Sequence, residues 1–258
     1  MRRVEPKVFL IGETRLDNSQ VQRYLDHVKT NFKITSKASD SEALVEFMGR
    51  LCYRSWEPGL NANVTKVREG NDKYIANILS VKHGSVLEHA VTHWVFADVS
   101  RVFTHELVRH RAGTAFSQES LRFVRLTDLG LWLPPEAREQ PWLQDLFEKT
   151  FQTLEGLQKE MAFALGLDNE GKQFKEKKVL TSLMRRLAPL GLATTIGVTF
   201  NFRALRHIIE MRTAASAEAE IRMVFDIVAR IAKIHWPNIF SDFEQNDAGE
   251  WVPKHSKV

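Results

Sequence analysis

Two spacings of apolar residues divide the chain into candidate strands and candidate helices. Apolar positions that alternate with polar ones, and that carry many β-branched and aromatic side chains, are typical of half-buried strands. This pattern marks residues 7–13 (KVFLIGE), 90–100 (AVTHWVFADVS) and 192–202 (LATTIGVTFNF). We expect the first of these strands to end at Gly12. The alternation therefore predicts a few strands that lie far apart along the chain.

Apolar residues that recur every three or four positions predict helices over most of the remaining chain. The predicted helices are residues 18–32, 40–53, 70–83 (ending in a turn at Gly84), 100–111, 142–165, 171–188 and a last helix that ends near Pro237. Ser41 or Asp40 is the expected N-cap of the second helix, and Ser100 that of the fourth, because short oxygen-bearing side chains satisfy the first amide groups.

The remaining segments are predicted to be a loop between helices and the C-terminal tail. Residues 130–141 (GLWLPPEAREQP) are rich in turn-forming residues, and the chain from about residue 240 shows no periodic pattern, so we expect a loose tail there. No repeat, low-complexity tract or shift in composition marks a domain boundary. Many helices with a few strands between them predict a single domain of the α+β class over residues 1–258.

Composition narrows the class of protein. The 258 residues are 43% hydrophobic and 26% charged, which is ordinary for a globular protein that buries a core. No run of about 18 apolar residues predicts a membrane-spanning helix, and the first apolar run is too short for a signal peptide. The only cysteine, Cys52, excludes a disulfide within the chain and argues against a cysteine-based zinc site, so a reducing, cytoplasmic setting fits.

The net charge of +4 and the isoelectric point of about 9.2 are mildly basic. They fit sites for small anions as well as they fit nucleic acid. The stretch RHRAGTAFSQESLRF, residues 109–123, concentrates this charge. Three consecutive residues at a predicted helix end, Arg109, His110 and Arg111, cannot share one helix face. The following mixture suits a loop around a polar ligand, with Arg122 on an anionic group. A solvated basic patch and a phosphate-backbone contact are the alternatives.

Two further stretches carry candidate chemistry. In KHGSVLEHAVTH, His89 and His93 would have metal-ligand spacing on a helix, but a strand is predicted there and no His-Glu-x-x-His motif is present. Partly buried, hydrogen-bonding histidines are favoured over a metal site. In NFRALRHIIEMR, Arg203, Arg206 and His207 have the spacing of one helix face, where an anionic ligand would relieve their repulsion. A solvated helix face is the alternative. Without a glycine-rich phosphate loop, these clusters favour several small anionic ligands.

Taken in order, these motifs resemble those of the flavin-dependent thymidylate synthases. The family's Arg-His-Arg followed by Ser-x-Arg-Tyr stands here as RHR and SLRF, its His-x-Thr/Ser-x-x-Glu-His as HGSVLEH, and its ARVSF-like segment as GRLCY. An arginine before Leu-x-Pro matches Arg185, and an Asn-x-Arg with a later arginine matches Asn201, Arg203 and Arg212. The matches run from about residue 49 to 221, which is most of the chain.

The resemblance implies a fold and an activity. Helices would pack on a small, mostly antiparallel sheet, and a homotetramer would hold its active sites at the subunit interfaces. The enzyme would convert dUMP to dTMP with a methylene group from methylenetetrahydrofolate and hydride from NADPH, passed through bound FAD. By this resemblance the flavin contacts are His83, Ser85, Glu88, Arg109, His110, Arg111, Asn201, Arg203 and His207. The dUMP contacts are Glu106, Gln118, Glu119, Ser120, Arg122, Arg185 and Arg212.

The expected chemistry assigns roles within that set. Carbon 5 of uracil becomes nucleophilic when donors stabilise an enolate-like charge on the ring, and Arg212 is the candidate donor. Ser120 is the family's other catalytic candidate, but no base beside it is visible in the sequence, so a binding role is preferred. Cys52 is a tempting alternative nucleophile, for which a buried packing role near the flavin is preferred. No metal is expected.

Several positions depart from the family pattern. Eight residues separate Arg111 from Ser120, one more than usual, and Phe123 replaces a tyrosine. Glu106 stands where a glutamine often binds the nucleotide, and its carboxylate would repel a phosphate unless protonated or turned away. His207 and Ser216 fall where Asn and His are frequent. These departures keep two other interpretations open, a related flavoenzyme acting on another pyrimidine nucleotide and a nucleic-acid-binding protein.

Overall fold

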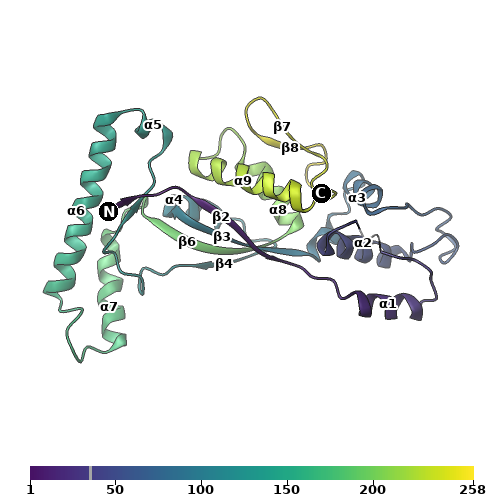
Figure 1. The fold of residues 1–258 in the computed structure, drawn as a ribbon, viewed down its shortest axis with the longest axis horizontal. Helices are drawn as coiled ribbons and strands as arrows, with labels where there is room; N and C mark the ends of the chain where they lie inside the picture. The colour runs from purple at the N-terminus through teal and green to yellow at the C-terminus, as the bar shows by residue number, and fades with distance from the viewer. Residues whose placement is uncertain (35–36) are drawn as a thin grey trace.

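A four-stranded antiparallel sheet forms the centre of the molecule (Figure 1). The computed structural model describes residues 1–34 and 37–258. The strand order is β2 (Lys7–Glu13), β3 (Val91–Ser100), β6 (Ala193–Asn201) and β4 (Thr114–Gln118), and every neighbouring pair is antiparallel. The expected mixture of helices and a small antiparallel sheet is therefore confirmed.

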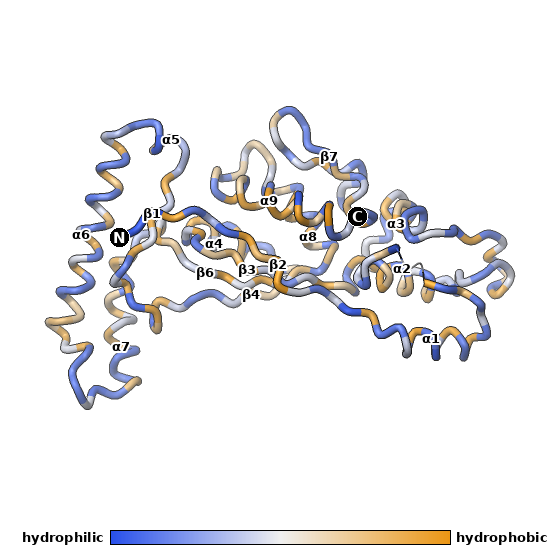
Figure 2. Tube along the Cα trace, in the orientation of Figure 1, coloured by the Kyte–Doolittle hydropathy of each residue, from blue (hydrophilic) through white to orange (hydrophobic). Residues whose placement is uncertain are grey.

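Three helices cover one face of this sheet: α4 (Arg101–Leu107), α8 (Phe202–Arg212) and α9 (Ala219–His235). Side chains alternate across a strand, so every second residue of β3 and β6 points into this layer. Trp94, Phe96 and Phe200 are fully buried there. Figure 2 shows the apolar side of α9 turned toward the sheet. The main core draws on residues from Val45 to Val258, which supports one domain.

The opposite face of the sheet carries no helix in Figure 1. Its outward positions on β2 include Phe9 and Ile11, which are 47% and 64% exposed. These two residues are two positions apart and so lie on the same face of the strand. Exposed apolar side chains grouped in this way form a surface suited to contact with another protein.

Two groups of helices extend from the ends of the sheet (Figure 1). One end carries α1 (Asn18–His27), α2 (Asp40–Tyr53), α3 (Asn71–Ser80) and the 3-10 helix η1 (Gly84–Glu88). The other end carries β1 (Arg2–Arg3), β5 (Gly130–Leu131), α5 (Pro135–Arg138), α6 (Pro141–Ala164), α7 (Phe174–Met184) and the 3-10 helix η2 (Arg185–Leu187). No helix within the described part of the chain has the length and apolar character needed to cross a bilayer.

Local corrections concern caps and strand ends. The N-cap of α2 is Ser39, not Ser41 or Asp40, because Ser39 and Glu42 form a reciprocal capping box. Ser41 instead donates to Glu13. The strand β2 continues past Gly12, where its pairing with β3 shifts by one residue, and α1 ends at His27 rather than near residue 32.

The predicted loop after the Arg-His-Arg triplet is also wrong in part. Residues Thr114–Gln118 form β4, the edge strand that pairs with β6. Five residues with alternating exposure are a strand pattern, but the hydroxyl and small side chains hide it, because hydrophobicity alone does not separate such an edge strand from a loop.

The expected loose tail is wrong. Strands β7 (Phe243–Gln245) and β8 (Trp251–Pro253) pair as a hairpin, and Phe243, Trp251 and Val258 are buried. The hairpin is held by Arg206, which donates to both carboxylate oxygens of Asp242 at 2.7 and 3.0 Å. Sequence periodicity misses this element because each of its strands has only three residues.

A buried carboxyl group joins α9 to the junction of β3 and α4. Glu220 is 1% exposed and accepts from the Ser100 amide at 2.7 Å and from its hydroxyl. Ser100 caps α4 as expected. Burial outweighs these hydrogen bonds and raises the pKa of Glu220 to about 7.

This carboxyl group gives a pH-dependent stability with a definite sign. A folded-state pKa above the unfolded value of 4.5 means that the folded chain binds the proton more tightly. The contribution is complete below pH 4.5 and is lost as the pH rises through about 7. We expect Glu220→Gln to become more stable relative to the parent between pH 5 and 8, by up to about 3 kcal/mol. Urea unfolding of both chains at each pH measures this difference, and a pH-independent difference would contradict it.

Candidate functional site

The start of α8 is tied to the loop that follows the Arg-His-Arg triplet. Asn201 caps α8 by accepting from the Ala204 amide at 2.8 Å, and its own amide donates to the Gly113 carbonyl at 2.9 Å. Gly113 has a φ of +70°, and a Cβ atom there would lie 2.5 Å from Nδ2 of the Asn201 side chain. Only glycine accommodates both the left-handed backbone and this close approach.

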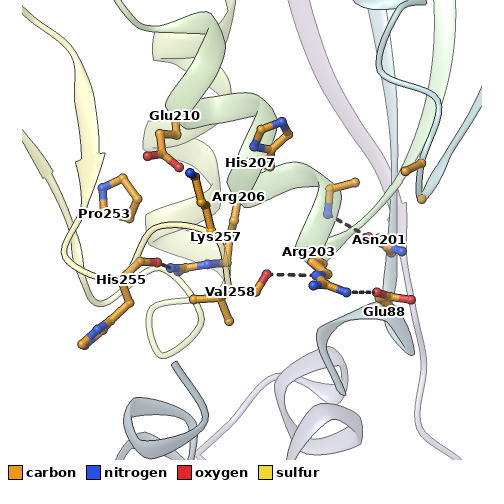
Figure 3. Close-up of a pocket in the computed structure, with 13 residues that line it drawn as sticks. Glu88, Asn201, Arg203, Arg206, His207, Glu210, Pro253, His255, Lys257 and Val258 are labelled. Atoms are coloured by element: carbon orange, nitrogen blue, oxygen red, sulfur yellow. Dashed lines mark hydrogen bonds and ion pairs between the residues drawn. The ribbon is translucent and has the colours of Figure 1, made fainter. Parts of the chain in front are cut away.

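A cavity of about 370 Å³ opens at this junction (Figure 3). It contains four of the residues expected to contact flavin, which come from η1 and α8: Glu88, Asn201, Arg203 and His207. Arg203 pairs with Glu88 at 2.6 Å and also donates from Nε to the Val258 carbonyl at 2.9 Å. The cavity therefore presents an amide, a guanidinium and an imidazole, a donor set that fits phosphate and heterocycle oxygens.

One residue of the expected helix face is not in this donor set. The guanidinium of Arg206 is 5% exposed and is held by Asp242 and by the Ile239 carbonyl. Arg203 and His207 are exposed, so the three side chains do not share one solvated face. The three- and four-residue spacing does fit one helix face. Arg206 nevertheless points into the interior, where it pairs with the buried Asp242 carboxylate.

His83 lies outside this cavity, at the first turn of η1. Its ring stacks on Tyr53 with centroids 5.5 Å apart, and the Tyr53 hydroxyl lies 2.9 Å from its Nε2. Both residues line a separate cavity of about 430 Å³ beside α2 and α3. Ser85 is exposed on η1. The buried packing role expected for Cys52 is wrong, because Cys52 is exposed near the end of α2.

The Arg-His-Arg triplet points in different directions, as the spacing requires. Arg109 and Arg111 are exposed, whereas His110 is partly buried and accepts from Arg212 Nε at 2.7 Å. Burial, the Arg212 guanidinium and His207 together lower the pKa of His110 to about 4. The imidazole is therefore neutral at pH 7, and its unprotonated Nε2 orients Arg212.

Glu106 holds the other side of the same guanidinium. Arg212 donates to the Glu106 carboxylate at 2.5 Å and to its main-chain carbonyl at 2.8 Å. The Glu106 carboxylate thus forms an ion pair with Arg212. This pairing explains how a negative charge is tolerated at a position where glutamine is frequent in the family. With Glu106 and His110 on either side, Arg212 has a fixed orientation at the end of α8.

A second cavity, of about 270 Å³, lies between the start of α4 and η2. Arg101, Arg185 and Arg186 line it together with Leu121 and Ser182. The Arg101 Nη1 atom is buried and has no hydrogen-bond acceptor, and burial beside Arg185 lowers the pKa of Arg101. The Nε atom of Arg122 is also buried without an acceptor. Unpaired buried donors of like charge are costly unless an anion fills the space between them.

Arg101 was missed by sequence reasoning. The sequence does contain a clue to Arg101. It directly follows the N-cap Ser100 and so places a cation in the first turn of a helix, where positive charge is unfavourable. Such a placement indicates a reason other than helix stability.

The residues between the two arginine groups are used within the fold. Gln118 donates to the Thr104 hydroxyl at 3.1 Å, and Glu119 accepts from the Thr195 amide at 3.1 Å. The Ser120 hydroxyl accepts from the Arg122 amide at 3.3 Å. Within residues 1–34 and 37–258, Ser120 has no hydrogen bond to a basic side chain, and its binding role stays a prediction.

The two candidate sites lie at opposite ends of β4. Thr114 pairs beside the first cavity, next to Asn201, and the chain after Gln118 leads to Leu121, which lines the second. Four residue steps of about 3.4 Å separate these ends by about 14 Å. The first cavity and the Arg101 cavity are therefore separated along β4, whereas Arg212 bonds to His110, whose ring contacts His207 of the first cavity.

Comparison with known proteins gives consistent results. Residues 33–238 match the family model described as thymidylate synthase complementing protein. The flavin-dependent thymidylate synthase of Corynebacterium diphtheriae is 38% identical over 216 residues, covering 83% of each chain. That of Mycolicibacterium gilvum is 35% identical over 213 residues, covering 81% of this chain and 82% of the relative.

Solved structures agree in fold. Thymidylate synthase X from Helicobacter pylori, crystallised with FAD and dUMP, superposes with a TM-score of 0.57 at 16% identity, covering 91% of this chain and 99% of that one. The UMP/dUMP methylase PolB from Streptomyces cacaoi superposes with a TM-score of 0.61, also at 16% identity, covering 93% and 94%.

Proposed function

The chain belongs to the flavin-dependent thymidylate synthase family, and on that premise we propose which of its residues carry out the family reaction. The enzyme is an FAD-dependent methyltransferase that makes dTMP from dUMP. Methylenetetrahydrofolate supplies the one-carbon group, and NADPH supplies the two electrons that reduce it to methyl. In the overall reaction, dUMP, methylenetetrahydrofolate, NADPH and a proton are converted to dTMP, tetrahydrofolate and NADP+.

The group of unpaired arginines carries the substrate assignment. Arg101 and Arg185 line one cavity, and the Arg101 Nη1 atom and the Nε atom of Arg122, which follows the cavity-lining Leu121, are buried without acceptors. The phosphate of dUMP is an anion of matching size, and arginine forks bind such oxygens with two parallel hydrogen bonds. Gln118, Glu119 and Ser120 border this group and would contact the sugar and base. The phosphate would thus relieve the repulsion that otherwise makes this cluster costly.

The cavity at α8 fits part of the flavin dinucleotide. Asn201, Arg203 and His207 supply donors, and Gly113 lets the Asn201 side chain lie close against the loop at the cavity edge. Bound FAD would supply hydride chemistry, and the chain's task is to bind and orient it. His83 and Ser85 extend this donor set along η1, and Arg109 and Arg111 project from the adjoining loop into solvent.

Arg212 is the residue we assign to uracil activation. Its guanidinium is held by Glu106 and His110, so the atoms facing the substrate need no rearrangement when charge develops on the ring oxygen. Neutral His110 is important here, because an imidazolium would repel Arg212 and could not accept its Nε proton. Glu106 keeps the second guanidinium nitrogen in place and away from the phosphate.

A homotetramer with shared sites is part of the proposal. The α8 cavity and the Arg101 cavity lie at opposite ends of β4, and this separation favours sites that a second copy completes. The helix-free face of the sheet, with Phe9 and Ile11 exposed, supports close contact between copies. We further propose a cytoplasmic location, which agrees with an exposed free thiol at Cys52.

Anaerobic assay of the purified enzyme tests the function. With FAD, NADPH and methylenetetrahydrofolate present, dTMP should form only when dUMP is added. A protein that lacks the yellow colour of oxidised flavin, and that makes no dTMP, would contradict the assignment. Methylation of UMP but not dUMP would instead show the alternative pyrimidine substrate.

Removing the second-cavity arginines should weaken nucleotide binding specifically. We expect Arg101→Ala and Arg185→Ala each to raise the KM for dUMP about 10- to 100-fold, because a charge-assisted hydrogen bond to phosphate contributes about 1.5–3 kcal/mol. The affinity for FAD should not change. Binding of deoxyuridine, which lacks the phosphate, serves as the control and should be unaffected. Equal weakening for both compounds would place the phosphate elsewhere.

A further inference from the structure

The last residues of the chain form one wall of the flavin cavity. Pro253, His255, Lys257 and Val258 line it opposite Asn201 and Arg203 (Figure 3). None of these four belongs to a sequence motif of the candidate site. The question is what this wall contributes to ligand binding.

The wall is anchored at two points. On one side, His255 donates its amide to Asp242 at 3.0 Å, and its carbonyl accepts from Arg206 at 3.3 Å. On the other side, the Val258 carbonyl accepts from Arg203. Lys257 lies between these anchors with a φ of +55°, a conformation that costs a non-glycine residue about 1 kcal/mol. Both anchors are needed to hold that backbone, so the segment is built into the cavity and does not lie on it loosely.

Gly84 of the HGSVLEH motif provides the room for this wall. A Cβ atom at position 84 would overlap the main chain of Val258 and come within 2.8 Å of Arg203 Nε. The wall therefore fits directly against η1, and Val258 is 9% exposed. Through this contact the end of the chain also helps to fix the guanidinium of Arg203.

The charges around the cavity indicate a role for Lys257. Arg203 is paired with Glu88, and Arg206 is paired with Asp242. Glu210 also lines the cavity and would repel an anionic dinucleotide. Figure 3 shows the Lys257 side chain extending across the cavity toward Glu210, whereas the imidazole of His255 points away. Lys257 thus offsets the negative charge of Glu210 and adds a cation to the side of the cavity away from Arg203.

We propose that residues 254–258 are a cofactor-binding element, in which the wall closes the flavin cavity and Lys257 supplies a cation for the anionic part of the dinucleotide. This inference rests on the proposed function, since it takes FAD as the occupant. It assigns a binding role to a segment outside the family motifs.

Direct measurement of FAD affinity tests the proposal without using turnover. In titrations of the flavin-free tetramer followed by flavin fluorescence, a chain lacking residues 254–258 should bind FAD about tenfold more weakly or worse. Lys257→Ala should weaken binding about two- to fivefold, with the loss diminishing as salt is added. Lys257→Arg should bind like the parent.

Lys254→Ala is the matched control, since Lys254 belongs to the same segment but is exposed and does not line the cavity. Its FAD affinity should equal that of the parent. The glycine contact is tested by Gly84→Ala, which should cost less affinity in the truncated chain than in the full chain, because Val258 is then absent.

Equal FAD affinity of the parent, the truncated chain and Lys257→Ala would overturn the proposal, and tighter binding after truncation would show an obstructing segment. Equal costs of Gly84→Ala in both chains would overturn the contact with Val258. Failure of the parent itself to bind FAD would instead contradict the proposed function, so the two outcomes are distinct.

Discussion

Replacing Arg212 with alanine should reduce dUMP-dependent turnover about 100- to 1000-fold, the usual cost of removing one donor to a developing oxyanion. The substitution also leaves Glu106 without its counter-ion and His110 without its donor. Glu106 and His110 do not line the α8 cavity, and only the contact of the His110 ring with His207 links them to it. Bound FAD should therefore remain, and the loss should appear in kcat. Single-turnover assays with spectroscopically confirmed flavin content measure it.

Two further variants separate charge stabilisation from general disruption. Arg212→Lys keeps the charge but loses the fork that holds Glu106 and His110 together, so it should recover only a small part of the activity. Arg23→Ala removes an exposed arginine on α1, remote from both cavities, and should leave turnover unchanged. If Arg212→Ala turned over at the parent rate, Arg212 would not be the activating residue.

Replacing Arg206 with alanine should be the most destabilising single change, with a loss of about 3–5 kcal/mol in the free energy of unfolding. The guanidinium is 5% exposed, the Asp242 carboxylate is 7% exposed, and the Phe243 ring lies 4.8 Å below the cation. Removing the arginine leaves the buried Asp242 carboxylate without its counter-ion and the Ile239 and His255 carbonyls without this donor. Urea unfolding monitored by circular dichroism measures the loss.

The comparison with matched variants shows whether burial is the cause. Lys149→Ala breaks an exposed ion pair on α6, in which the lysine is 70% exposed, and should cost at most about 0.5 kcal/mol. Combining Arg206→Met with Asp242→Asn removes both charges and should recover part of the stability. A loss below about 1 kcal/mol for Arg206→Ala would mean that water reaches Asp242.

Much of the fold follows from local patterns along the chain. The strand at residues 91–100 and the helix at 40–53 were predicted within a residue or so, because alternation and helical spacing reflect burial on one side of each element. The short elements escaped prediction. Strand β4 has too few apolar residues, and the hairpin of β7 and β8 depends on Arg206, which is distant in sequence.

The candidate site divides in the same way. The motifs identified the family and predicted a set of binding side chains, since residue type sets what a group can donate or accept. They could not show that Arg206 is buried while Arg203 is exposed, that Glu106 turns to Arg212, or that Arg101 joins Arg185. Each of these facts is a contact between segments far apart in sequence.

By itself, the sequence determined the class of fold, the family and the kinds of ligand, because local periodicity and residue chemistry are properties of single segments. Only the tertiary structure decided which cations are paired and which are unpaired, and that Pro253, His255, Lys257 and Val258 line the cavity at α8. The physical reason is that pairing and burial depend on distance in space, which the chain order does not specify.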